Sequence, residues 1–174
     1  LTKGTKQKQA PQLEVFLAER AANLSASASK ETFALGGSWP VQFNKDMLGL
    51  IKETLSSPAF AKQEVEREKS SQIAEISSKE DQPLGLAFRK LMPFFFPNQT
   101  QGFYRMGEPE NVAKFTSKQV QNYWKKQIAQ PWVLAVCGQF DRDEMIAFAQ
   151  SLPKPSKKKK KMPEPVWTKE NNLS

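Results

Sequence analysis

Two glutamates of one predicted helix are the residues of this chain best placed to do chemistry. The stretch 58–82 reads PAFAKQEVEREKSSQIAEISSKEDQ, and it carries Glu68 and Glu75 seven positions apart. Because an α-helix turns once in about 3.6 residues, this spacing places both carboxylates on one face. The pair could therefore act together at a site that needs two carboxylates. The alternative is an ordinary solvated helix, which commonly carries glutamates and lysines as spaced ion pairs.

The residue types that the chain lacks limit its chemistry. Its 174 residues include no histidine and one cysteine, Cys137. Serine–histidine and cysteine–histidine catalysis are excluded within this chain, and so are zinc sites built from imidazoles or from several thiolates. Cys137 lies in the apolar stretch WVLAVCG, which predicts a small buried side chain rather than a nucleophile.

The positive charge is concentrated near the C-terminal end. Of the net charge of +8, Lys154 and residues 157–161 supply six units, which leaves +2 for the rest. These lysines lie between prolines in PKPSKKKKKMPEP, a pattern typical of a solvated connector. We expect no nucleic-acid partner, because basic residues with interleaved aromatic side chains are not spread over the chain. Nucleic-acid binding through residues 157–161 is the alternative.

The order of the predicted elements indicates an α+β fold, with helices packed on one face of a largely antiparallel sheet. Two short strands should turn near Lys30, and the apolar run 131–138 predicts a buried strand. Thr116 with Gln119, and Asp141 with Glu144, are expected to cap two helices. The remaining predicted helices cover residues 10–23, 44–55, 58–82 and 84–92, the last ended by Pro93.

The chain is expected to form one domain over residues 1–153. Residues 154–165 read as a linker, and residues 166–174 as the start of a further module. Since the chain opens on Leu1 rather than methionine, we interpret it as a piece of a longer polypeptide, with no membrane span predicted. Its aromatic segment PFFFPNQTQGFYRM favours buried anchors for a long loop, and the alternative is the lining of a peptide-binding chamber.

The ordered series of segments resembles the pitrilysin and insulysin family of zinc peptidases, the inverzincins, with mitochondrial processing peptidase among its relatives. The resemblance covers about residues 1–153 and rests on LSASASKETFALGG, LSSPAF, EREKSSQIAEI, GEPENVAKFTSKQV and QPWVLAVCGQFD. In that family a helix carries the motif H-x-x-E-H, whose two histidines bind zinc and whose glutamate activates water. The resemblance implies that Glu75 matches the further zinc ligand and that Glu68 matches the acidic residue supporting it.

This chain departs from the family at the motif itself. H-x-x-E-H would lie just before Leu1, and no catalytic residue is expected within the chain. The resemblance therefore implies a non-catalytic half that helps to enclose a peptide substrate, while zinc belongs to the parent enzyme or partner half. Two alternatives stay open: a truncated catalytic half with Glu75 as third zinc ligand, and a non-proteolytic scaffold subunit. The expected partners are a homologous half or subunit, a peptide, or a second copy of the chain. The expected compartment is the periplasm or the cytoplasm of a bacterium.

Overall fold

A two-stranded antiparallel sheet lies at the centre of the computed structural model, which describes residues 1–97 and 99–156. Strand β1 (Asn23–Ala28) pairs with β2 (Phe33–Ser38), and the register runs from Asn23 opposite Ser38 to Ala28 opposite Phe33. The turn is closed where the Ser29 amide donates to the Thr32 carbonyl oxygen at 2.8 Å. The alternating LSASAS pattern predicted this hairpin, and its α+β setting is confirmed.

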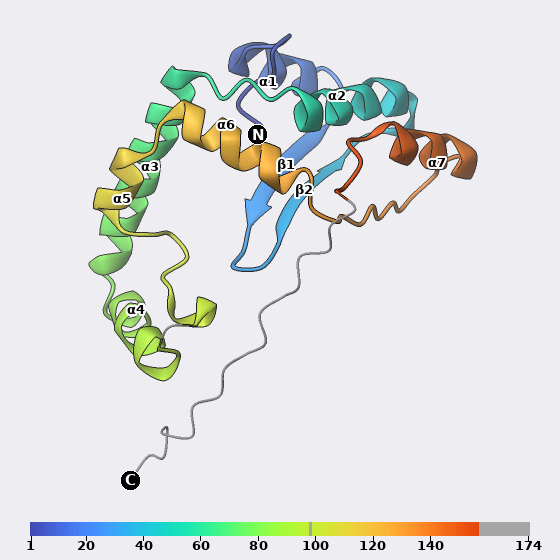
Figure 1. Cartoon of the computed structure of the whole chain (residues 1–174). Coiled ribbons are helices and arrows are strands. Elements are labelled where there is room, and N and C mark those ends of the chain that lie inside the picture. The colour runs from blue at the N-terminus through green and yellow to red at the C-terminus, as the bar shows by residue number, and fades with distance from the viewer. Residues whose placement is uncertain (98, 157–174) are drawn as a thin grey trace.

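Helices α1 (Ala10–Ala18) and α2 (Asn44–Ser56) bury the first core cluster beside this sheet (Figure 1). Leu13 and Met47 are fully buried, and Leu50 joins them. The partly buried Leu24 brings β1 into the same cluster. The short η1 (Val41–Phe43) leads from the sheet into α2. Burial of these apolar side chains is the main force that fixes the two helices against the hairpin.

Helix α7 (Arg142–Ser151) completes a second cluster with α2. Its members are Leu48, Met145, Phe148 and Leu152. Only one of the two hydrogen bonds of the predicted capping box forms at this helix. The Glu144 amide donates to Asp141 Oδ1 at 2.7 Å. The Glu144 carboxylate instead accepts from Asn44 Nδ2 at 2.9 Å, which ties α7 to α2.

The other helices form an arm that extends away from the sheet (Figure 1). It consists of α3 (Lys62–Glu80), α4 (Pro83–Phe95), η2 (Thr100–Gly102) and α5 (Pro109–Lys114). Helix α6 (Ser117–Gln127) then returns across the hairpin, where the Trp124 ring lies 5.5 Å from Phe33. Its capping box of Thr116 and Gln119 is present as predicted.

The predicted strand over residues 131–138 is wrong for this structure. The segment is irregular, Val133 is 93% exposed, and Cys137 is exposed rather than buried. A strand needs a neighbour to receive its amide and carbonyl hydrogen bonds. In the described part of the chain no strand lies beside this segment, so its β-forming sequence has no ladder to join.

Several helix boundaries also differ from expectation. Helix α4 continues past Pro93 instead of ending before it. A proline in the last turn removes only one backbone hydrogen bond, and the Phe96 amide still donates to the Met92 carbonyl. Helix α1 ends at Ala18, ahead of a turn in which Ala21 has φ of 47°. Helix α5 was not predicted, although Pro109 at its first turn is a helix-start signal.

Parts of the predicted domain organisation lie outside the described residues. They are residues 157–165 of the predicted linker, with its lysine run, and the further module at 166–174. No helix in the described ranges is long and apolar enough to cross a membrane.

Candidate functional site

The two glutamates singled out by their spacing are both exposed and paired with lysines. Glu68 Oε1 lies 3.3 Å from Lys3 Nζ, and Glu75 Oε1 lies 2.8 Å from Lys79 Nζ. The two glutamate side chains are 53% and 57% exposed, respectively. Exposed ion pairs of this kind contribute little to stability, and each carboxylate already has a cation as its neighbour. On α3 these residues show the features of a solvated helix.

The described residues do not fit a zinc ion on their own. Zinc sites in proteins use three or four side-chain ligands. Residues 1–97 and 99–156 contain no group of three histidine, cysteine, aspartate or glutamate side chains that could hold a metal. Glu75 would therefore need histidines from outside this chain.

A small pocket of about 230 Å³ lies where the N-terminal residues meet α3, α5 and α6. Leu1, Val65 and Val112 contribute apolar walls, and Glu68 lies at its margin. Burial lowers the pKa of the Leu1 α-amino group below its ordinary value of 8.0, while the negative charge of Glu68 acts in the opposite direction. The pocket therefore combines apolar walls with four charged side chains, which are Glu64, Glu68, Lys3 and Lys69.

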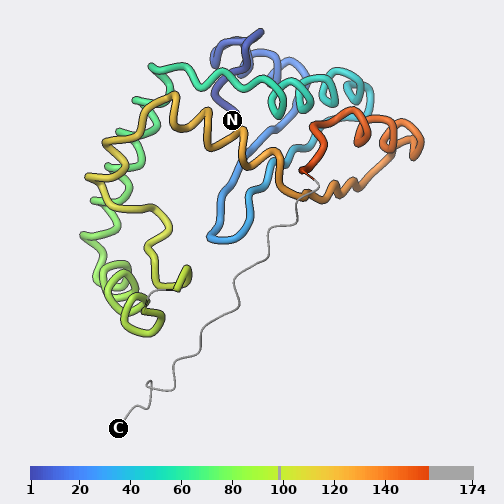
Figure 2. Tube along the Cα trace, viewed as in Figure 1, coloured from blue at the N-terminus to red at the C-terminus, as the bar shows by residue number. Residues whose placement is uncertain are grey.

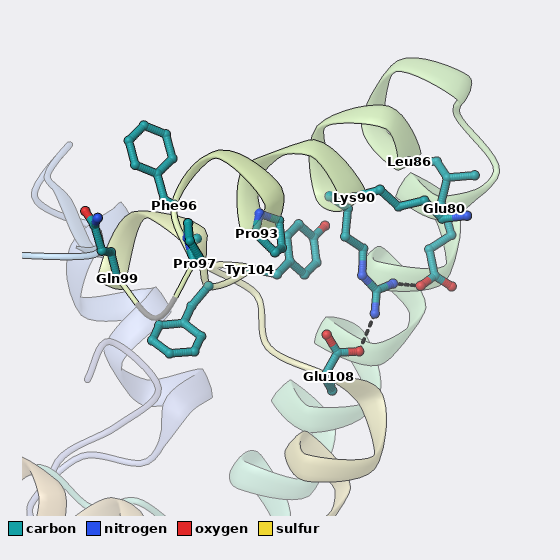
Figure 3. Close-up of a pocket in the computed structure, with 12 residues that line it drawn as sticks. Glu80, Leu86, Lys90, Pro93, Phe96, Pro97, Gln99, Tyr104 and Glu108 are labelled. Carbon is teal, nitrogen blue, oxygen red and sulfur yellow. Dashed lines mark hydrogen bonds and ion pairs between the residues drawn. The ribbon is translucent and has the colours of Figure 1, made fainter. Parts of the chain in front are cut away.

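A larger pocket of about 670 Å³ lies between the end of α3, α4 and η2 (Figure 3). Its apolar walls come from Leu86, Pro93, Phe96, Pro97, Phe103 and Tyr104. Phe103 is 68% exposed, so the pocket presents aromatic surface that water can reach. A cavity of this size with aromatic walls and a few charged groups is typical of a site for part of a peptide or another small ligand.

Arg89 organises the charged side of this pocket. Its guanidinium forms ion pairs with Glu80, the last residue of α3, and with Glu108, just before α5. Figure 3 marks both pairs with dashed lines. The guanidinium also lies 5.1 Å from the centre of the Tyr104 ring, a favourable cation–π arrangement. One side chain therefore ties together α3, α4 and the loop that leads to α5.

The aromatic segment 93–106, which covers the end of α4 and the loop after it, does not form the buried anchors that its sequence favours. Phe94 is 71% exposed and Phe95 is 45% exposed. The segment instead contributes Phe96, Phe103 and Tyr104 to the larger pocket. The physical reason is that α4 packs on few other elements, so the arm offers too little covering surface for all of these rings. The alternative interpretation, a lining for a chamber, agrees with this arrangement.

The sequence profile of the insulinase family, peptidase family M16, matches residues 1–107. The chain belongs to this family. The match covers the hairpin and helices α1 to α4, including both Glu68 and Glu75. No curated protein matched this M16 chain.

Solved structures similar to this M16 chain agree with its fold. A peptidase M16 inactive domain from Pseudomonas fluorescens superposes with a TM-score of 0.77 at 21% identity, covering 89% of this chain and 40% of that one. A conserved protein from Enterococcus faecalis gives 0.72 at 18% identity, covering 88% and 41%. A protease from Helicobacter pylori gives 0.70 at 15% identity, covering 95% and 41%. The chain thus spans about two fifths of the length of these structures.

Sequence reasoning on this M16 chain missed the residues that build the larger pocket. Arg89, Glu80 and Glu108 have no motif in common and come together only through the packing of α4 on α3. One signal was available: the dense aromatic segment PFFFPNQTQGFYRM, which includes the three aromatic residues of the pocket, Phe96, Phe103 and Tyr104. From the sequence, the lining of a chamber was the less favoured of two interpretations of this segment, after buried anchors for a loop.

Proposed function

We propose that this chain is the non-catalytic half of an M16 peptidase, which encloses a peptide while a homologous half carries the zinc and hydrolyses the bond. One observation carries the proposal: Glu75, which matches the family's further zinc ligand, is 57% exposed and forms an ion pair with Lys79 in this chain. The similar structure from Pseudomonas fluorescens is itself described as an inactive domain, which supports the same reading.

The larger pocket is the part of this chain that suits a peptide. Phe96, Phe103 and Tyr104 offer aromatic surface for an apolar side chain, and Lys90 and Glu108 offer opposite charges at the same pocket. The two-stranded sheet supplies a second element, because β1 and β2 each have one edge without a strand neighbour among the described residues. An extended peptide could add to such an edge through its backbone hydrogen bonds. Capture of the peptide, and not its hydrolysis, is the activity we assign to this half.

The proposal gives Glu68 and Glu75 a role only if another segment supplies the missing histidines. If two histidines were supplied from another segment, Glu75 would be placed as the third zinc ligand and Glu68 as its support, as the family resemblance implies. Within residues 1–97 and 99–156, no group of side chains could hold zinc by itself, and no step of the proposed function passes through the metal.

A peptide-binding assay with and without zinc tests the proposal. We expect fluorescein-labelled peptides of mixed sequence to bind the chain without being cleaved, in the presence of added zinc. Phe103→Ser should weaken binding about 5- to 30-fold, the range typical of losing one buried aromatic contact. Val15→Ser is the matched control, because Val15 is 57% exposed on α1, away from the pocket.

Two results would count against this function. Zinc-dependent cleavage by the chain, abolished by Glu75→Gln, would make it a catalytic half. Absence of peptide binding at millimolar concentrations would instead favour the scaffold subunit, in which the M16 fold assembles complexes without any role in proteolysis.

A further inference from the structure

Met106 lies in the loop 103–108, which leads from η2 to α5 (Figure 2). Two hydrogen-bond donors reach its thioether sulfur. Lys79 Nζ of α3 donates to Met106 Sδ at 3.4 Å, and the Tyr104 hydroxyl donates to the same atom at 3.5 Å. A thioether is a weak acceptor, whereas an ammonium and a phenol are good donors. The sulfur therefore satisfies only poorly the two groups that reach it.

The backbone of the loop holds the sulfur at this place. The Gly107 amide donates to the Tyr104 carbonyl oxygen at 3.0 Å, which closes a turn that contains Met106. Gln72 Nε2 of α3 donates to the Met106 carbonyl oxygen at 2.7 Å. Because the turn is bonded to the same helix that carries Lys79, neighbouring contacts keep the sulfur and its donors together.

The other methionines of the described residues have no such donors. Met47 is fully buried and Met145 is 7% exposed, and each belongs to a core cluster. Met92 on α4 is partly buried, like Met106, and in residues 1–97 and 99–156 no hydrogen bond reaches its sulfur. The fifth methionine, Met162, lies outside the described residues. Met92 is therefore a natural comparison for Met106.

Oxidation would turn the weak acceptor at Met106 into a strong one. The reaction with hydrogen peroxide transfers one oxygen atom to the thioether. The sulfur donates an electron pair to one peroxide oxygen, the O–O bond breaks, and the proton of the transferred oxygen moves to the departing hydroxide, which leaves as water. The sulfur is oxidised to the sulfoxide and the peroxide is reduced. Met106 is partly exposed, so a small oxidant can reach the side chain.

The two donors also connect the sulfur to features described above. Lys79 Nζ lies 2.8 Å from Glu75 Oε1. The Tyr104 ring lines the larger pocket and lies 5.1 Å from the Arg89 guanidinium. A stronger acceptor at Met106 would therefore act both on α3 and on one wall of the pocket.

We propose that Met106 is an oxidation site whose sulfoxide oxygen accepts hydrogen bonds from Lys79 and Tyr104 and thereby holds the loop 103–108 more firmly on α3. Oxidation of a methionine usually disrupts the packing around it, because a polar group replaces an apolar one. At Met106 the new oxygen meets two donors that are already in place, so the local structure gains hydrogen bonds. This inference concerns modification and does not depend on the peptide-binding function proposed above.

Peroxide treatment of the whole chain tests the proposal in a Met92→Leu/Met162→Leu background, in which the remaining methionines besides Met106 are the buried Met47 and Met145. We expect mass spectrometry of peptides to find one added oxygen atom on Met106 before either buried methionine reacts. The Gly107 amide, which closes the turn, should then exchange about 3- to 10-fold more slowly.

Variants that remove the donors make the result specific. In Lys79→Ala/Tyr104→Phe, oxidation should no longer slow the exchange of the Gly107 amide, because both donors are gone. Lys69→Ala removes another paired lysine of α3 and should keep the slowing. Met106→Gln places a carbonyl oxygen in the same region without any oxidant and should slow the exchange by itself.

Three results would overturn the proposal. The first is a Met106 that stays reduced until the core methionines react. The second is faster exchange of the Gly107 amide, either after oxidation or in Met106→Gln. The third is a slowing that survives in Lys79→Ala/Tyr104→Phe or that is lost equally in Lys69→Ala.

Discussion

Glu75 Oε1 lies 2.8 Å from Lys79 Nζ, one turn further along α3, and the glutamate side chain is 57% exposed. The residue that the family resemblance marks as a zinc ligand is therefore engaged in an ordinary surface ion pair in this chain. Its neighbour on the same helix face, Glu68, is paired with Lys3 in the same way.

Glu75→Gln is expected to leave both the fold and the zinc affinity of the isolated chain almost unchanged. The free energy of unfolding should change by less than about 0.5 kcal/mol, because solvent screens an exposed pair. Urea unfolding and zinc titration calorimetry measure the two quantities. Glu66→Gln, which breaks the similar pair with Lys69, is the matched control. A 10-fold loss of zinc affinity confined to Glu75→Gln would show that the chain holds zinc through this residue.

Replacing Arg89 should loosen the arm around the larger pocket. Arg89→Met removes ion pairs to Glu80 and Glu108 and leaves two carboxylates facing each other. We expect a loss of about 1 kcal/mol after allowance for solvent screening, with faster amide exchange in α4. Arg89→Lys should recover only part of the loss, because an ammonium lacks the planar fork of a guanidinium. If Lys90→Met, on the same helix, has an equal effect, the contribution of the Arg89 pairs is not specific.

Trp124 should be the side chain that matters most for the return of α6 across the hairpin. Its Nε1 donates to the Leu55 carbonyl at 3.0 Å, and the residue is 8% exposed. Trp124→Phe is expected to cost about 1–2 kcal/mol of unfolding free energy, because the carbonyl loses its partner. Trp132→Phe also removes an indole donor, but Trp132 is 38% exposed and should lose less than about 1 kcal/mol. Equal losses in chemical denaturation would contradict this ranking.

When residues 1–174 are prepared as a separate polypeptide, its stability should rise with pH through the titration of the Leu1 α-amino group. Burial depresses the pKa of this group in the folded chain below its ordinary value of 8.0. Between the two pKa values the unfolded chain binds more protons, so unfolding becomes harder as pH increases, and this contribution levels off above about pH 8. Thermal unfolding from pH 6 to pH 9 measures it. Acetylation of the N-terminus should abolish this rise, and an unchanged pH profile after acetylation would exclude the α-amino group as its source.

The local elements were the most predictable part of the fold. The LSASAS alternation predicted the hairpin, and the capping box at Thr116 and the apolar faces through Leu48 and Met145 predicted three of the helices. These signals succeed because hydrogen bonding and side-chain periodicity within one element depend on neighbours that are close in sequence. The candidate site was less predictable, since a spacing of seven on α3 says that two carboxylates lie on one helix face, but not what that face meets.

The sequence by itself therefore determined the family, the α+β class and the absence of imidazole chemistry. Tertiary structure decided which surfaces are open. It brought Arg89 between Glu80 and Glu108, turned Phe103 towards solvent, and left residues 131–137 irregular, with no strand neighbour in the described ranges. Each of these outcomes depends on contacts between segments far apart in the chain. The apolar pattern of residues 131–138 favours a strand, but only the neighbouring backbone decides whether that strand can form.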